Sequence, residues 1–274
     1  MIRYLKLVNF ELNRFKKIYF TLLVLTLLSQ SAAVLFQTRS YLKRTFEIMK
    51  LENLTEKAYV LEYGGFYFSY ITDFLLFIGP FALSLVALIF YIFLIWYRDW
   101  FGKNTFVYRL LMLPTSRMSV YLSKATAIFL MVLGLVAFQL MILPLEYKLC
   151  EWMIPETFLN SSITINSIIN SSDLLRIIIP ESFSLFLIYC GMVLMIMFIL
   201  FAIILFERSY RVKGIVMGVL YIVAASTMIV GPVYFGGDYL YLEEKFGLLL
   251  ILCICITGLT LWVSRWLLIK KITV

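Results

Sequence analysis

The sequence predicts an all-α polytopic membrane protein with six transmembrane helices, and composition is the first observation that predicts it. Of the 274 residues, 63% are hydrophobic and only 15% are charged, and the mean hydropathy is +0.96. Soluble domains have about 45–50% apolar and about 25% charged residues. We therefore expect a single transmembrane domain over residues 1–274 that is adapted to lipid.

The second observation is that apolar residues form six runs of about 20 residues, the length that crosses the hydrocarbon core of a bilayer as a helix. A helix is expected for each run because it satisfies the backbone hydrogen bonds within the segment. The predicted spans are 18–36, 74–97, 121–145, 184–206, 214–232 and 246–268.

The third observation is the distribution of charge. With the amino terminus in the cytoplasm, the inner segments 1–17, 98–124, 207–213 and 265–274 hold sixteen of the 24 Lys and Arg residues but three of the 16 acidic residues. Cytoplasmic segments are enriched in basic residues, so both termini are predicted to be cytoplasmic. Topology and anionic lipid account for the net charge of +8, and no nucleic-acid partner is expected.

Residues 1–17 are predicted to form an amphipathic helix that lies on the cytoplasmic leaflet. At 100° per residue the apolar side chains, among them Val8, Leu12 and Phe15, fall within one arc, and basic and amide side chains lie opposite. The alternative is the n-region of a signal peptide with an apolar region from Ile18. The apolar run is long enough to span, which favours the first interpretation.

Two external segments, 37–73 and 146–183, are predicted. Charges in 39–57 have a helix-compatible pattern, and the aromatic stretch 66–70 is expected to form an interfacial belt, with a substrate-facing vestibule as the alternative. The second segment holds Asn160 and Asn170 in weak glycosylation motifs and is expected to be a solvated loop. Near Gly231-Pro232 the fifth span is predicted to be interrupted, so 233–244 forms either a short re-entrant piece or an ordinary turn.

No catalytic, cofactor-binding or metal site is predicted in this chain. There is no His, and Cys190, Cys253 and Cys255 lie in predicted spans, where packing is the expected role. A lipid-modifying enzyme is the least favoured alternative, because nothing in the sequence brings the external carboxylates, such as Glu146, together.

The source of energy for any transport must lie in another chain. The middle of each predicted span lacks Asp, Glu, Lys and Arg, the groups that ion-coupled transporters use, and the chain has no P-loop motif. Neutral polar side chains within the spans form a candidate substrate path, although hydrogen bonds between helices are the favoured interpretation of them. These side chains are Gln30, Ser84, Gln139 and Ser226.

The inner segment 98–120 carries the most specific pattern. Gly102 ends the preceding helix, Asn104 or Thr105 can cap a new one, and Pro114 stops it, so a short amphipathic helix is predicted over 103–113. A soluble partner can hold a helix of this kind in a groove. The alternative is a surface helix that only stiffens an inner loop.

This segment resembles the first inner loop in the membrane subunits of type-2 ATP-binding-cassette exporters. That loop commonly has an acidic residue, a Gly-Thr-like turn, leucines, Leu-Pro-x-Ser-Arg and a Lys at the next span. The matching residues here are Asp99, Gly102, Thr105, Leu110-Leu111, Leu113-Pro114-Thr115-Ser116-Arg117 and Lys124. An Asp replaces the more usual Glu, and the external segments are long for the family.

The resemblance implies a permease subunit in the cell membrane, namely a bacterial plasma membrane. Such a subunit would export an amphipathic, lipophilic or peptide-like substrate. It would pair with a second permease subunit, as a homodimer or heterodimer, and dock a cytoplasmic ATPase that binds the ATP and Mg²⁺; the chain itself would not be an enzyme. A membrane sensor or scaffold that binds an external ligand is the alternative. The expected docking residues are Asp99, Phe106, Val107, Arg109, Leu110, Leu111, Leu113 and Arg117.

Overall fold

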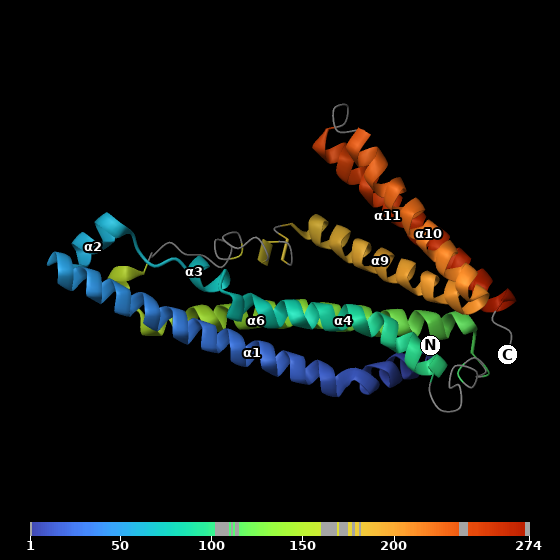
Figure 1. The fold of residues 1–274 in the computed structure, drawn as a ribbon, viewed down its shortest axis with the longest axis horizontal. Coiled ribbons are helices and arrows are strands. Elements are labelled where there is room, and N and C mark those ends of the chain that lie inside the picture. Colours follow the sequence, from blue (N-terminus) through green and yellow to red (C-terminus); the bar gives the residue numbers. More distant parts are fainter. Residues whose placement is uncertain are drawn as a thin grey trace. The chain divides into compact units, whose positions relative to one another are not determined.

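The computed structural model is built from helices (Figure 1). It describes residues 2–101, 110, 112, 115–159, 169, 175–176, 179–180, 182–235 and 241–271. The helices, in chain order, are α1 (Ile2–Glu52), α2 (Glu56–Tyr63), α3 (Ser69–Thr72), α4 (Leu75–Phe101), α6 (Arg117–Met153), the 3-10 helix η1 (Glu156–Phe158), α9 (Phe183–Tyr210), α10 (Val212–Phe235) and α11 (Leu242–Lys270).

Six of these helices, α1, α4, α6, α9, α10 and α11, are long and apolar enough to cross a membrane. Each contains all or nearly all of one of the six predicted spans. Within the described ranges there is no strand, and the one isolated β-bridge joins Phe66 and Leu159. The prediction of an all-α, multi-pass membrane protein is confirmed at this level.

Helix α1 differs from its prediction because it is continuous. The sequence suggested an interfacial helix over 1–17, a separate span and an external segment, but one helix of 51 residues covers Ile2–Glu52. At 1.5 Å per residue it is about 75 Å long, more than twice the hydrocarbon thickness. No Gly or Pro occurs in this stretch, so nothing in it ends the helix.

Two proline-based boundaries are also wrong. Helix α6 contains Pro144 and continues to Met153, into the segment predicted to be external. Helix α10 continues through Gly231-Pro232 to Phe235, so the fifth span is not interrupted there. Between α10 and α11 only Tyr241 is described, and the two Asn-Ser-Ser motifs lie outside the described residues. A proline removes one backbone donor, which a long apolar helix tolerates in a membrane protein.

The chain divides into two compact units. Unit 1 comprises 1–15, 88–130 and 183–274, and unit 2 comprises 16–87 and 131–182, so α1, α4 and α6 each contribute to both. The core of unit 2 is aromatic and includes Phe66, Phe77 and Phe158. In unit 1, α9 packs against α10 and α11, with Met195, Ala225 and Ile256 buried between them.

Candidate functional site

A buried ionic cluster lies in unit 1 at the two ends of the inner segment. Lys124 of α6 is at its centre, with its side chain 1% exposed. The ammonium Nζ donates to Glu11 Oε1 of α1 at 2.7 Å, to the carboxylate of Asp99 of α4, and to the backbone carbonyl of Ile95 at 3.1 Å. All three donors of the ammonium are therefore used, and the cluster joins three helices.

Two arginines complete the cluster at its edge. Arg14 donates to Asp99 Oδ1 at 2.8 Å and lies 3.6 Å from Glu11, and Arg98 Nη2 lies 3.5 Å from Glu11 Oε2. Both carboxylates are at most 2% exposed, whereas the two arginines are 23% and 35% exposed. A buried carboxylate without a cation is strongly unfavourable, so these pairs fix which faces of the helices meet.

Helix α1 positions Glu11 because its neighbours on the same face are apolar and buried. Val8, Glu11 and Phe15 follow each other at spacings of three and four residues, and all three are buried. The ring of Phe15 stacks on Tyr91 of α4 with 3.8 Å between centroids. Sequence reasoning assigned Val8 and Phe15 to a membrane-facing arc, but in unit 1 they pack against protein.

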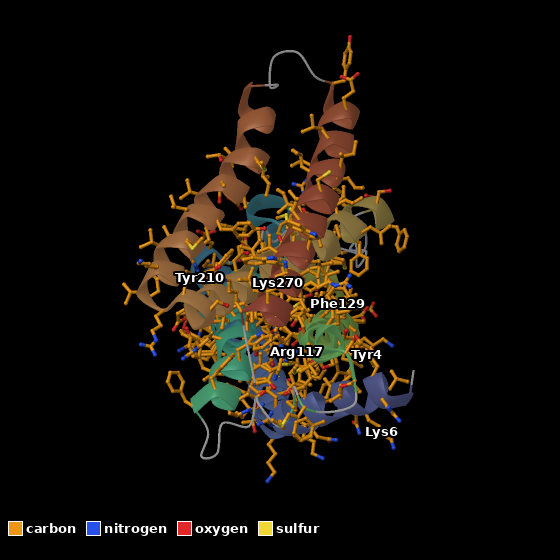
Figure 2. All side chains as sticks on the ribbon, turned by 90° about the vertical axis from the view of Figure 1, so that its right-hand side faces the viewer. Tyr4, Lys6, Arg117, Phe129, Tyr210 and Lys270 are labelled. Carbon is orange, nitrogen blue, oxygen red and sulfur yellow. The ribbon has the colours of Figure 1, made fainter. Side chains whose placement is uncertain are left out.

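Nearer the amino terminus of the same helix, Tyr4 contacts α6. Its hydroxyl donates to the Leu122 carbonyl at 3.3 Å and shares a hydrogen bond with Thr126. Figure 2 shows Lys6, two residues further along α1, with its side chain directed outward. The first turns of α1 thus pack against α6 with Arg3 and Lys6 exposed, whereas Arg14 takes part in the ionic cluster.

Aromatic side chains connect α4 and α6 to α9. The Lys124 ammonium lies 5.4 Å from the centroid of Trp96, and Trp96 packs edge-on against Phe201 at 5.5 Å. Tyr121, which is fully buried, stacks on Phe198 at 5.9 Å and accepts a hydrogen bond from Ser264 of α11. The ionic cluster is therefore continuous with the packed interior of unit 1.

The last turns of α4 and α9 are joined by a second polar contact. The Tyr97 hydroxyl donates to the carboxylate of Glu207, and the Arg208 guanidinium lies 5.0 Å from the Tyr97 ring and 4.3 Å from the Phe101 ring. A cation over an aromatic face is attracted by the negative face of the ring. Both contacts hold α4 at the residues that lead directly into the inner segment.

Three of the eight predicted docking residues are described. Asp99 is inside the ionic cluster, a set of neighbours that sequence reasoning did not anticipate. Leu110 is buried, at 6% exposure, and Arg117 donates to the Leu268 carbonyl of α11 at 2.6 Å (Figure 2). Of the helix predicted over 103–113 only Leu110 and Met112 are described, and Phe106, Val107, Arg109, Leu111 and Leu113 lie outside the described residues.

Two of the four candidate path residues meet in unit 2. Gln30 Nε2 donates to Gln139 Oε1 at 3.2 Å and to the Phe77 carbonyl at 3.1 Å, and both amides are 1% exposed. This is the hydrogen bond between helices that the sequence favoured. Ser84 donates to the Pro80 carbonyl of its own helix, and Ser226 is exposed on α10.

Glu146 is a functional candidate that sequence reasoning placed in an external loop. It lies within α6 in unit 2 and is 1% exposed. Both carboxylate oxygens lack a hydrogen-bond partner among the described residues. Across the same residues no group of His, Cys, Asp and Glu is arranged to hold a metal ion, and the four cysteines are free.

Comparisons with protein-family models, with curated proteins and with solved structures each found no match for this chain.

Proposed function

We propose that the chain is the membrane subunit of an ATP-driven exporter and that the inner segment 98–120 receives a nucleotide-binding partner. The observation that carries the proposal is the ionic contact between Asp99, at the start of this segment, and Lys124, four residues after its end. Both also contact the first turns of α1, through Arg14 and Glu11. The six membrane-length helices and the absence of a P-loop from the sequence are consistent with a permease that uses ATP bound elsewhere.

The ionic cluster provides a physical route for energy input. A movement of the inner segment that separated Asp99 from Lys124 would leave buried charges unpaired, at a cost of about 3–5 kcal/mol. The ends of α4 and α6, and the start of α1, are therefore expected to move together when a partner moves the segment. This coupled movement re-packs the spans and releases an amphipathic substrate outward, with ATP and Mg²⁺ bound to the partner.

The experiment replaces Phe106 with Asp and measures substrate-stimulated ATP hydrolysis by the chain purified with its ATPase. Phe106→Asp places a charge on the apolar face of the predicted docking helix, and we expect stimulation to fall at least tenfold, which corresponds to about 1.4 kcal/mol. Val212→Asp is the control, because Val212 is 75% exposed at the turn between α9 and α10 and lies outside the docking segment. Leu110→Asp is a weaker test because Leu110 is buried.

Membrane insertion and folding of each variant are measured by size-exclusion chromatography and thermal unfolding. Stimulation that is unchanged in a folded Phe106→Asp variant, or that falls equally in Val212→Asp, would contradict the docking proposal. The tenfold loss is the result expected for a homodimer, in which both copies carry the substitution. In a heterodimer the sister permease keeps an intact segment, and a residual half of the stimulation is expected.

A membrane sensor is the second candidate function, and one observation favours it. Unit 2 has a cavity of about 420 Å³ lined by α1, α2 and the chain that follows α2. A sensor would bind a ligand there and recruit a cytoplasmic regulator through the inner segment. The two functions are distinguished by the adjoining reading frame, which encodes an ATPase with a Walker motif only under the exporter hypothesis.

A further inference from the structure

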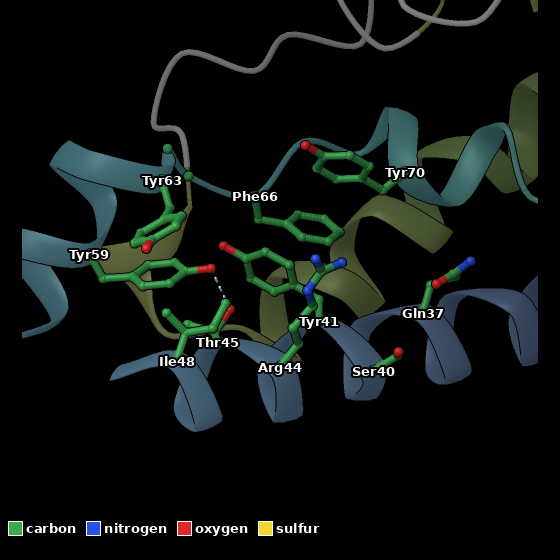
Figure 3. A pocket seen from close by; sticks show the side chains of 12 residues that line it. Gln37, Ser40, Tyr41, Arg44, Thr45, Ile48, Tyr59, Tyr63, Phe66 and Tyr70 are labelled. Carbon is green, nitrogen blue, oxygen red and sulfur yellow. Dashed lines mark hydrogen bonds between the residues drawn. The ribbon is translucent and has the colours of Figure 1, made fainter. Parts of the chain in front are cut away.

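The cavity of unit 2 has a lining that neither transport nor docking explains. Five aromatic side chains and one arginine dominate it, and Figure 3 shows them around the hollow between α1 and the chain after α2. Tyr41 packs edge-on against Phe66 at 4.9 Å, and Tyr59 stacks on Tyr63 at 5.1 Å. The six residues are Tyr41, Arg44, Tyr59, Tyr63, Phe66 and Tyr70.

The wall of this cavity opposite α1 is fixed by the turn after α2. Gly64 ends α2 with a φ of 82°, a conformation that other residues rarely adopt, and this turns the chain toward Phe66. The Phe66 amide then donates to the Phe158 carbonyl at 2.8 Å, and both rings are buried. The aromatic wall is therefore held by backbone bonds and is formed before any ligand arrives.

Two rings of the lining are held in place by hydrogen bonds of their hydroxyl groups. Tyr59 accepts a hydrogen bond from Thr45 at 3.3 Å, and the Tyr63 hydroxyl donates to both oxygens of Glu52 at 2.8 and 2.9 Å. The hydrogen bond to the Glu52 carboxylate raises the pKa of Tyr63. The Tyr41 ring lines the cavity, but its hydroxyl is buried, so the ring and not the hydroxyl faces a ligand.

Charge decides which ligand fits. Arg44 is the only charged residue of the described lining, and no ion pair joins it to another described residue. Aromatic rings alone would suit an organic cation, but the guanidinium repels one. A guanidinium pairs best with the planar oxygens of a carboxylate or with a phosphate, and the rings accept an apolar or aromatic group.

We propose that this cavity binds an amphipathic anion, in which one carboxylate or phosphate contacts Arg44 and a flat apolar group lies against the tyrosine rings. The carboxylate of a peptide and the phosphate of a lipid headgroup share this chemistry. The site does not depend on ATP-driven transport, and its test needs only the purified chain.

The test measures binding of N-acetyl-tryptophan by isothermal titration calorimetry to the full chain in phosphatidylcholine nanodiscs. A ligand of this size is expected to bind with a Kd of about 0.1 mM. N-acetyl-tryptophanamide, which lacks the charge, should bind roughly tenfold more weakly to the wild type. Arg44→Gln should weaken the acid by the same factor and make acid and amide bind alike.

Two further variants separate charge from ring contacts. Lys43→Gln makes the same charge change one residue away, and because Lys43 does not line this cavity, it should leave binding of the acid unchanged. Tyr70→Ala removes a ring that is 59% exposed and should weaken acid and amide equally. Thermal unfolding confirms that each variant is folded, as expected for exposed positions.

The outcomes decide the proposal. Absence of saturable binding, equal binding of acid and amide by the wild type, or an equal loss in Lys43→Gln overturns it. Phosphatidic acid added to the nanodiscs identifies the source of the anion. Competition with N-acetyl-tryptophan in the wild type but not in Arg44→Gln assigns the site to a lipid phosphate, and no competition assigns it to a free carboxylate.

Discussion

The two units of the molecule bury polar groups in opposite ways, although the same three helices, α1, α4 and α6, contribute to both. In unit 1 a lysine lies between two carboxylates, and each of the three side chains is at most 2% exposed. In unit 2 the buried contact between Gln30 and Gln139 is a neutral hydrogen bond of 3.2 Å, and the buried carboxyl group of Glu146 has no ion pair among the described residues. Among the described residues of these three helices, the buried ion pairs therefore lie in unit 1.

The difference indicates where the molecule resists rearrangement. Removal of one partner of a buried ion pair costs several kcal/mol, whereas a single neutral hydrogen bond between membrane helices contributes about 1–2 kcal/mol at most. The ionic region flanks the inner segment, and the neutral region lies in the unit that contains the aromatic cavity. We infer that the ionic region moves as one body and that the neutral region adjusts its packing.

The largest expected effect is that of Lys124→Met, which leaves Glu11 and Asp99 buried without their shared cation. We expect a loss of about 3–5 kcal/mol in the free energy of unfolding, measured by denaturant titration in detergent. Lys213→Met is the matched control, since Lys213 is exposed, and should change stability by less than about 0.5 kcal/mol. Equal stability of the two variants would show that the cluster contributes nothing.

A triple variant tests whether the loss in Lys124→Met comes from the unpaired carboxylates. Glu11→Gln, Asp99→Asn and Lys124→Met together remove every charge that Lys124 organises, so no carboxylate remains unpaired. Its stability should recover most of the loss seen in Lys124→Met. If it is less stable than the single variant, the net attraction of the charges outweighs their desolvation.

An intermediate effect is expected in unit 2. Gln30→Leu leaves the amide of Gln139 and the carbonyl of Phe77 without their partner, and should lower stability by about 1–2 kcal/mol. The double variant with Gln139→Leu should be closer to the wild type, because only the Phe77 carbonyl then lacks its donor. Thermal unfolding of the wild type, the single variant and the double variant checks this order of stability. If the two glutamines only lined a substrate path, the substitutions would not produce this order.

The smallest effect is expected for Tyr97→Phe. The substitution removes the hydroxyl that donates to Glu207 and keeps the ring next to Arg208, so the loss should be about 0.5–1.5 kcal/mol. Tyr67→Phe is the control, because Tyr67 is 48% exposed and no hydrogen bond of its hydroxyl is observed among the described residues. A loss in Tyr97→Phe as large as that in Lys124→Met would mean that the contact between α4 and α9 is the main constraint on the segment.

Helix number was predictable from the sequence because bilayer thickness determines how long each apolar run must be. The ends of the helices were not predictable, and the reason for α1 differs from the reason for α6 and α10. Polar composition marked 37–73 as separate from its span, but α1 has no Gly or Pro that would end it before Glu52. Pro144 and Pro232 lie inside helices, where each costs one backbone hydrogen bond and ends nothing.

The ionic cluster was only partly predictable. Asp99 and Lys124 belonged to the pattern that resembled an exporter loop, yet their mutual contact depends on how α4 and α6 pack. Glu11 gave one local signal, an acidic residue on the same helix face as Val8 and Phe15. Glu146 gave none, because its burial results from the continuation of α6 past the predicted span.

The aromatic cavity includes part of the stretch 66–70, for which the sequence suggested an interfacial belt with a substrate-facing vestibule as the alternative. The structure places Phe66 and Tyr70 on the cavity and buries Phe68, and the role of the stretch stays a prediction. The contribution of Arg44 was not foreseen, since the sequence separates it from these rings by more than twenty residues. Only the return of the chain at Gly64 brings them together.

The most direct test of the account is purification of the chain from its own membranes, followed by mass spectrometry and an ATP-hydrolysis assay of the complex. The exporter account predicts a cytoplasmic ATPase with a Walker motif in a fixed ratio to this chain, which is lost from the complex in Phe106→Asp and retained in Val212→Asp. Purification of the chain without any such ATPase, or with one that Phe106→Asp retains in full, would contradict it.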